Sequence, residues 1–330
     1  MNSESKDFVA NYELNDYRYQ EFWKGRQYEH ESEVLLLKKL LKKHIPDLAD
    51  RQIMDLGGAY GRLSFLYEKD AKGVILADYS TSELKEGIKR ISALPEQKKF
   101  SFVALNAYKL PYKNNSLQAL LSVRVMHHLK NIELFWEELA RTLSPGGVAI
   151  IEFANKNHIL ALVRHAFKFK LLQYLKVNTI QVGHQQTSQG MKEGQVSIMY
   201  NFSPSYIAKL TQKVGLELEG RYSCSFFRHQ VFKKYLPHTL LLSLEKIAQS
   251  LFGWTQITPS VFFVVRKPLS LTDVRKNEGL VLHESLCCPL CYAEVSRKPT
   301  GYVCTNGHEF SSTEEIIVDL RDPRPSEITF

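Results

Sequence analysis

The chain has 330 residues, 44% hydrophobic and 24% charged, which suits one full-size domain with a small additional module. No stretch approaches the roughly 20 apolar residues that a membrane-spanning helix needs, and the N-terminus has no apolar signal segment. These features exclude an integral membrane protein, and we expect a cytoplasmic protein without membrane contact. The net charge of +8 is concentrated between residues 156 and 255, where 13 Lys/Arg stand against 4 Asp/Glu. This basic segment fits either a phosphate-binding surface or a solvated face that lacks acids.

The predicted elements begin with a helix over residues 29–44, which covers the main domain as an N-terminal cap (1–50). Apolar runs then alternate with helical stretches; the runs are "QIMDL", "GVILAD", "FSFVAL", "LQALLSV" and "GVAIIEF". This alternation predicts a parallel α/β sheet in a domain over 51–267.

The alternation ends near residue 155, where a basic insert over about 156–255 begins. Apolar spacing in "ILALVRHAFKFKLLQYLK" predicts one amphipathic basic helix over 159–176. A Gly/Gln-rich loop, "VGHQQTSQGMKEGQ", follows. Further strands, "LELEGRYS" and "SVFFVVRK", would extend the sheet. Residues 268–282 are mostly polar, which predicts a linker. A separate C-terminal module is expected over 283–330.

The loop after the first strand, "DLGGAYG", has glycines at Gly57, Gly58 and Gly61. This spacing fits neither the dinucleotide fingerprint nor a Walker loop. It fits an acidic-x-G-x-G-x-G pattern that begins at Asp55 and has Ala59 in place of the middle glycine. We expect Ala59 to keep a negative φ, or binding to be weakened, because a left-handed alanine costs roughly 1–2 kcal/mol.

This pattern resembles motif I of the class I S-adenosylmethionine-dependent methyltransferases, of the type 11-like group. The resemblance implies a Rossmann-like α/β fold with a mostly parallel seven-stranded sheet. It also implies S-adenosyl-L-methionine as cofactor, with Asp55 near its ammonium group and the loop glycines around the methionine part.

Further segments carry the same resemblance over about 130 residues. Asp78, which ends "GVILAD", matches the family's acidic residue that binds the ribose hydroxyls. "LNAYKLPY" matches the segment that contacts adenine, with Asn106 and Ala107 as candidates; Asn106 could also be a turn former. "LLSVRVMHHLKN", with Arg124, matches the fourth strand and its turn. Arg26 and Tyr28, in a segment that could close over the cofactor or simply lead into the helix, are weaker candidates.

His127 and His128 are the candidates for a general base, because histidine titrates near neutral pH. A structural role is the alternative for either of them.

Cysteines and a histidine cluster near the end of the chain as Cys288-x2-Cys291 and Cys304-x3-His308. Two such pairs predict a closed, structural Cys3His zinc site, with Cys287 as the alternative to Cys288. This module resembles the zinc ribbon of bacterial large-subunit rRNA guanine-N1 methyltransferases, although theirs is N-terminal. It also resembles the small zinc-ribbon activator subunit of other methyltransferases.

We therefore expect a methyltransferase acting on an N or O atom, with RNA favoured over a small metabolite as methyl acceptor. A protein partner is kept as an alternative, as is a catalytically silent scaffold that only binds the cofactor.

Overall fold

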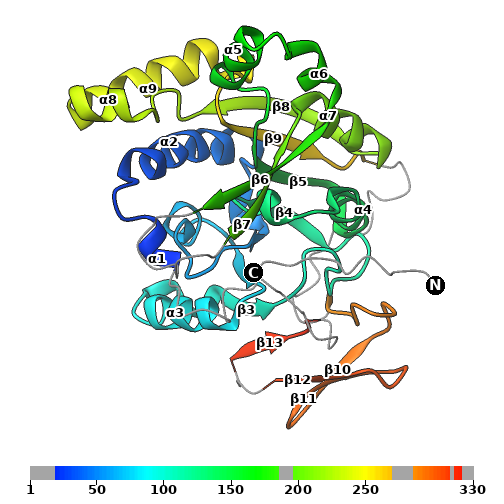
Figure 1. Cartoon of the computed structure of the whole chain (residues 1–330). Coiled ribbons are helices and arrows are strands. Elements are labelled where there is room, and N and C mark those ends of the chain that lie inside the picture. Colours follow the sequence, from blue (N-terminus) through cyan, green and yellow to red (C-terminus); the bar gives the residue numbers. More distant parts are fainter. Residues whose placement is uncertain (1–18, 186–195, 270–284, 313–315, 322–330) are drawn as a thin grey trace.

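The computed structural model describes residues 19–185, 196–269, 285–312 and 316–321. The predicted linker lies almost wholly outside these ranges. A central sheet runs through the molecule (Figure 1), with strand order β13-β3-β2-β1-β4-β5-β9-β8. Its strands are β1 (Gln52–Leu56), β2 (Gly73–Asp78), β3 (Phe100–Ala104), β4 (Leu117–Ser122), β5 (Leu143–Ala154), β8 (Glu217–Cys224), β9 (Ser260–Arg266) and β13 (Ile317–Asp319).

The sheet is mostly parallel, as predicted, and β9 and β8 pair antiparallel at one edge. It has one strand more than the seven expected. The additional strand, β13, comes from the C-terminal module and pairs parallel to β3. Strand β13 has three residues, too few to show the alternation of apolar and polar residues that predicts a strand, so the sequence carries no signal for this pairing.

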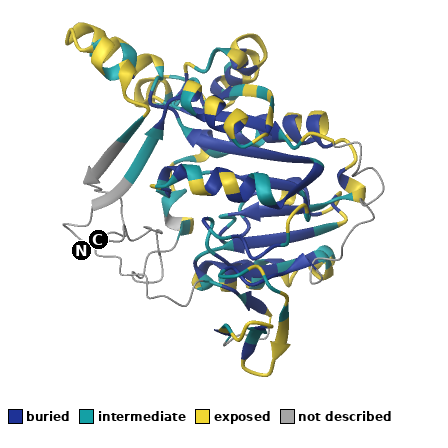
Figure 2. Cartoon of the chain, turned by 90° about the vertical axis from the view of Figure 1, so that its right-hand side faces the viewer, coloured by how far each residue is buried: buried dark blue, intermediate teal, exposed yellow. Residues whose placement is uncertain are grey.

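Helices cover both faces of the sheet, because each buries an apolar stripe against the strands. One face carries α2 (Gln27–His44) and α3 (Thr81–Ile91), and the other carries α4 (Ile132–Thr142) and α7 (Pro204–Lys213). Ser80 is the N-cap of α3, and its hydroxyl accepts a hydrogen bond from the Glu83 N–H (3.3 Å). The buried strands form the dark layer in Figure 2.

The predicted single helix over 159–176 is wrong. The structure has two helices, α5 (Ile159–Phe167) and α6 (Leu171–Lys176). Phe169, between them, has φ 53°, in the left-handed region that interrupts a right-handed helix. A hairpin of β6 (Thr179–Gln185) and β7 (Val196–Phe202) follows, so part of the predicted Gly/Gln-rich loop is a strand.

Helices α8 (Gln230–Tyr235) and α9 (His238–Phe252) lie with α5 and α6 at the β8–β9 end of the molecule (Figure 1). Among the helices of the described ranges, none combines the length and apolarity needed to cross a bilayer.

The C-terminal module is a small antiparallel sheet at the opposite end (Figure 1). Its strands are β10 (Val295–Lys298), β11 (Gly301–Cys304) and β12 (Glu309–Ser311). The Tyr292 hydroxyl donates to Glu138 of α4 (3.1 Å), and the Arg141 guanidinium lies over the Tyr292 ring (4.3 Å). Phe310 belongs to the same hydrophobic core as Trp136. The module is thus packed onto the α/β domain through shared core residues rather than tethered beside it.

Candidate functional site

The glycine-rich loop is held against the end of β2 by its backbone. The N–H groups of Gly57 and Gly58 both donate to the Ala77 carbonyl (2.8 and 3.1 Å). Gly57 has φ +72°, and a Cβ there would lie 2.1 Å from Val125 Cγ2. No other residue fits this position, because any side chain would be both strained and in collision with Val125.

Ala59 has φ 47°, so the expectation of a negative φ is wrong. Its N–H donates to Asp78 Oδ2 (2.9 Å), and this bond fixes the turn in the left-handed region. The other carboxylate oxygen of Asp78 accepts from the Ser80 N–H (2.9 Å). Asp78 therefore organises the loop and the start of α3 together. Weakened cofactor binding, the other expectation for Ala59, stays a prediction.

A cavity of about 680 Å³, including its part open to solvent, lies beside this loop at the carboxyl ends of the strands. It brings together six of the predicted residues: Gly57, Ala59, Asp78, Ala107, Arg124 and His128. An adjoining cavity of about 240 Å³ contains two more, Asp55 and Gly58. Gly61 has φ +76°, and its carbonyl accepts a hydrogen bond from Arg90 of α3.

Asp55 is buried, and the Tyr67 hydroxyl donates a hydrogen bond to its Oδ2. Burial raises the pKa of this carboxyl to about 6, against the opposing effects of the Tyr67 bond and the Arg62 charge. Asp55 thus faces the smaller cavity with a carboxyl that still ionises near neutral pH.

Asn106 forms a turn, which was the alternative reading of this residue. Its Oδ1 accepts from the Tyr108 N–H (2.9 Å). The two residues that flank it, Leu105 and Ala107, line the larger cavity. Asn106 itself lines neither of the two cavities, and its predicted contact with adenine stays a prediction.

The N-terminal candidates Arg26 and Tyr28 lie elsewhere. The Arg26 guanidinium stacks on Phe22 (4.0 Å). Tyr28, in α2, is buried against α9, where its hydroxyl donates to Glu245 Oε2 (2.5 Å). Tyr19, in α1 (Tyr19–Phe22), lines both cavities instead. The segment does approach the site, but through an aromatic residue that the sequence analysis did not single out.

A buried charge cluster, of which the sequence analysis named Arg124 alone, borders both cavities. Glu33 accepts from Arg62 Nη2 (2.8 Å) and Arg124 Nε (2.7 Å). Trp23 lies against both guanidiniums, at 3.7 Å from Arg62 and 4.9 Å from Arg124. Burial alone would raise the pKa of Glu33, but Arg124 and Arg62 hold it below its ordinary value. The signal was present in the sequence, because Glu33 falls on the same helical face as Leu36, Leu37 and Leu40.

The two histidines differ in position. His128 lines the larger cavity, whereas His127 is buried with its ring centre 4.1 Å from that of His128. Burial lowers the pKa of His128 to about 4, so its imidazole is neutral at pH 7.

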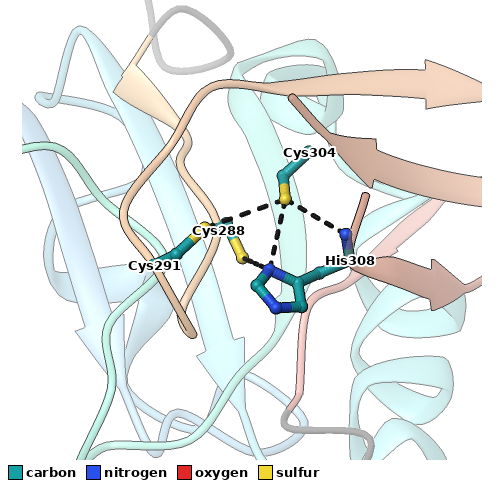
Figure 3. Close-up of side chains that lie close together, drawn as sticks. All are labelled: Cys288, Cys291, Cys304 and His308. Atoms are coloured by element: carbon teal, nitrogen blue, oxygen red, sulfur yellow. Dashed lines mark hydrogen bonds between the residues drawn. The ribbon is translucent and has the colours of Figure 1, made fainter. Parts of the chain in front are cut away.

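Cys288, Cys291, Cys304 and His308 turn toward one another in the C-terminal module (Figure 3), and their ligand atoms all lie within 4.8 Å. The Leu290 N–H donates to Cys288 Sγ (3.4 Å), and the His308 N–H donates to Cys304 Sγ (3.3 Å). Cys287 is buried away from the cluster, with its N–H bonded to the Pro111 carbonyl (2.9 Å). The four residues could hold one metal ion, and Cys288, not Cys287, completes the set.

Residues 54–151 match the family model described as a methyltransferase domain. Norajmaline N-methyltransferase of Rauvolfia serpentina is 29% identical over 119 residues, or 34% of this chain and 39% of that protein. A ubiquinone/menaquinone biosynthesis C-methyltransferase of Pseudoalteromonas translucida is 27% identical over 125 residues, or 36% of this chain and 50% of that protein. The chain therefore spans half or less of the length of these curated relatives.

A solved structure from Listeria monocytogenes, described as an S-adenosylmethionine-dependent methyltransferase, superposes with a TM-score of 0.50 at 15% identity. The superposition covers 72% of this chain and 99% of that one. With the strand order and the family match, this likeness defines the fold. Residues 54–151 match a methyltransferase domain model, and the fold around them is a Rossmann-like fold of the kind that class I methyltransferases have.

Proposed function

We propose that this chain transfers a methyl group from S-adenosyl-L-methionine to a small organic acceptor. The observation that carries the proposal is the cavity at the carboxyl ends of β1, β2 and β4, where Asp78, the Gly57 turn and His128 converge. When bound, the cofactor would supply a methyl group on a positively charged sulfur: the acceptor atom would bond to the methyl carbon as the C–S bond breaks, and its electron pair would leave with the sulfur as a neutral thioether. The protein's task is then to position the two reactants and to accommodate the acceptor's proton.

The residues of the site fit the parts of this cofactor. Asp78 carries a carboxylate suited to a vicinal diol and is fixed in place by two backbone N–H groups. Leu105 and Ala107 offer an apolar surface for a base. Asp55, in the smaller cavity, would hold the ammonium group, and Arg62 in the same cavity would favour the carboxylate.

We assign His128 to orienting the acceptor, through a hydrogen bond from the acceptor's N–H or O–H group. It lines the cavity and is neutral at pH 7, so its imidazole can accept a hydrogen bond there. His127, which is buried behind it, supports the ring and does not face the cavity opening.

The two features that suggested RNA are the cysteine-rich module and the basic insert. Their arrangement in the fold favours a small acceptor over RNA. The cysteine-rich module lies by β3 and β13, whereas the basic helices α5, α6, α8 and α9 lie at the other end of the sheet (Figure 1). They do not form one continuous surface. Both curated relatives, moreover, are named for methylation of small organic molecules.

We also propose that Cys288, Cys291, Cys304 and His308 bind a structural Zn²⁺. Neighbouring sulfurs of a tetrahedral zinc site lie about 3.8 Å apart, since Zn–S is about 2.3 Å. Cys291 Sγ and Cys304 Sγ are 3.8 Å apart. A set of four protein ligands leaves no position for a substrate, so the ion would stabilise the module.

Two measurements test the methyltransferase proposal. Calorimetry should detect S-adenosyl-L-methionine binding, and Asp78→Asn should weaken it about tenfold or more, because charged hydrogen bonds contribute roughly 1.5–3 kcal/mol. Asp70→Asn, at an exposed carboxylate, is the matched control and should bind normally. Incubation with cofactor labelled in the methyl group and fractionated cell extract should then place label in small molecules.

The outcomes separate the alternatives. Absence of cofactor binding contradicts the enzyme proposal. Label in RNA or in protein contradicts the small acceptor but keeps methyl transfer. Tight binding with no label in any fraction supports the second candidate, a cofactor-binding scaffold, for which the strained Ala59 is the motivating observation.

A further inference from the structure

The helices at the β8–β9 end of the molecule present large apolar side chains to solvent. Phe167 is 82% exposed, Phe169 98%, Leu172 79% and Trp254 72%. Others on the same helices are also exposed: Leu175, Val231, Tyr235, Ile247, Leu251 and Phe252. Isolated exposed apolar residues are ordinary, but so many on four adjoining helices mark an interaction surface.

These helices form one continuous end of the molecule. The Ile159 N–H at the start of α5 donates to the Ile257 carbonyl (2.9 Å), which follows α9. Helices α8 and α9 are separated only by Leu236 and Pro237 and contact each other. The helices lie at the top in Figure 1. Figure 2 shows the molecule turned by 90° about the vertical axis, and the helices at its top carry many exposed residues, drawn in yellow. We call residues 159–177 and 228–257 the helical end face.

The charge on the helical end face has one sign. Its exposed ions are all cationic: Arg164, Lys168, Lys170, Lys176, Lys234 and Lys246. Residues 159–177 contain no Asp or Glu, and the acid in 228–257, Glu245, is fully buried. Cations also alternate with aromatic rings in the run from Phe167 to Lys170.

We propose that the helical end face docks on an anionic lipid bilayer. Apolar side chains would enter the boundary between headgroups and acyl chains, while neighbouring Lys and Arg meet lipid phosphates. Lysine stems can lie along the apolar surface with their ammonium groups at headgroup level. Phe169, held in the left-handed region between α5 and α6, is the most exposed of these side chains and would insert into the bilayer.

The observations favour a bilayer over RNA or a protein. RNA would use the cations and could stack on the aromatic rings, but it would leave Leu172, Ile247 and Leu251 in water. The buried centre of a protein interface is depleted of charge, whereas here lysines are interleaved with the apolar residues. The expectation of no membrane contact rests on the lack of a stretch long enough to span a bilayer. A protein that binds at the bilayer surface penetrates only about 5–10 Å and needs no membrane-spanning helix.

Vesicle flotation of the full chain tests the proposal without reference to methyl transfer. The protein should float with vesicles of phosphatidylcholine and phosphatidylglycerol, and float less with phosphatidylcholine alone or at high salt. The double variant Phe167→Ser/Phe169→Ser should lower the partition coefficient about tenfold or more. Lys168→Gln should lower it about fivefold, and only on the anionic vesicles.

Ile316→Ser is the matched control, because Ile316 is 61% exposed but precedes β13 at the other end of the sheet. This variant should float like the wild type, and circular dichroism should show that all variants are folded. No flotation on anionic vesicles at low salt overturns the proposal. So does salt-dependent binding of single-stranded RNA in place of vesicles, or a self-associated oligomer that the Phe167/Phe169 variant dissociates.

Discussion

Glu33 joins the two guanidiniums beside the cavity. Its side chain is fully buried, and those of Arg62 and Arg124 are nearly so. A buried cation that loses its counter-charge keeps the cost of its desolvation. The conformation of both arginines, and through Arg124 the edge of the larger cavity, thus depends on one residue of α2.

Replacing this carboxylate should be costly. Glu33→Gln is expected to lower the free energy of unfolding by about 3–5 kcal/mol, because two buried guanidiniums lose their partner. Glu31→Gln, on the same helix and partly exposed opposite His238, should change it by less than about 0.5 kcal/mol. Denaturant unfolding monitors both. Equal effects of the two substitutions would contradict the structural role of the cluster.

Asp55 should make stability depend on pH. Its pKa in the folded chain is about 6, above the ordinary value of 3.8, so the unfolded chain releases this proton first as pH rises. The protonated Asp55 carboxyl therefore adds its full contribution to the free energy of unfolding, about 3 kcal/mol, below pH 3.8. This contribution is lost as the pH rises from there to about 6.

The comparison with Asp55→Asn isolates this contribution. The difference in unfolding free energy between wild type and variant should change with pH between 4 and 6 and be constant above, as denaturant titrations at each pH can measure. Asp70→Asn, which changes an exposed carboxylate, should leave the pH profile unaltered. A constant difference between wild type and Asp55→Asn across the range would show that burial does not raise this pKa.

At the scale of elements, the short strand β13 connects the cysteine-rich module to the sheet. Val318 is buried against β3, and Arg321, just beyond the strand, donates from Nη1 to the Tyr79 carbonyl (3.1 Å). Tyr79 lines the larger cavity. The strand therefore reaches from the module to the wall of the proposed cofactor site.

Val318→Asp should release this strand. It places a carboxylate in the core of the sheet edge and is expected to lower the free energy of unfolding by about 3 kcal/mol or more. Ile316→Asp, two residues earlier but exposed, should cost less than about 0.5 kcal/mol. The midpoints of denaturant unfolding distinguish them. If both variants unfold like the wild type, β13 adds nothing to the sheet.

The sequence predicted the strands that show a clear local pattern of apolar residues. It missed the structure that depends on contacts between residues far apart in the chain. The five runs from "QIMDL" to "GVAIIEF" are strands because each is apolar and bounded by turn residues. Strand β13 is three residues long and owes its existence to the unpaired edge of β3. Likewise, the motif located Asp78 and the loop, but only packing puts Tyr19 in the cavity and Tyr28 against Glu245.

At the scale of the whole molecule, the module and the main domain share one core. Cys288, Cys304 and Phe310 pack in the same cluster as Trp136 and Leu139 of α4. Metal bound by the module should therefore stabilise the chain as a whole, since binding energy at a folded site adds to folding energy.

Metal removal tests this coupling. Metal analysis should find about one zinc per chain, lost in Cys304→Ser and retained in Cys287→Ala, whose side chain lies outside the cluster. In calorimetry, a chelator should lower the melting temperature of the main transition of the wild type. An unchanged main transition, beside a separate small one for the module, would mean that the two parts fold independently.

The pairing of β13 with β3 also has a consequence for synthesis. The paired residues Phe102 and Ile317 are more than 200 positions apart. While a ribosome makes the intervening chain, the backbone N–H and C=O groups at the β3 edge have no strand beside them. An open edge of this kind is a template for pairing with other chains. The nascent protein would thus pass through an aggregation-prone interval that ends only when β13 emerges and closes the sheet.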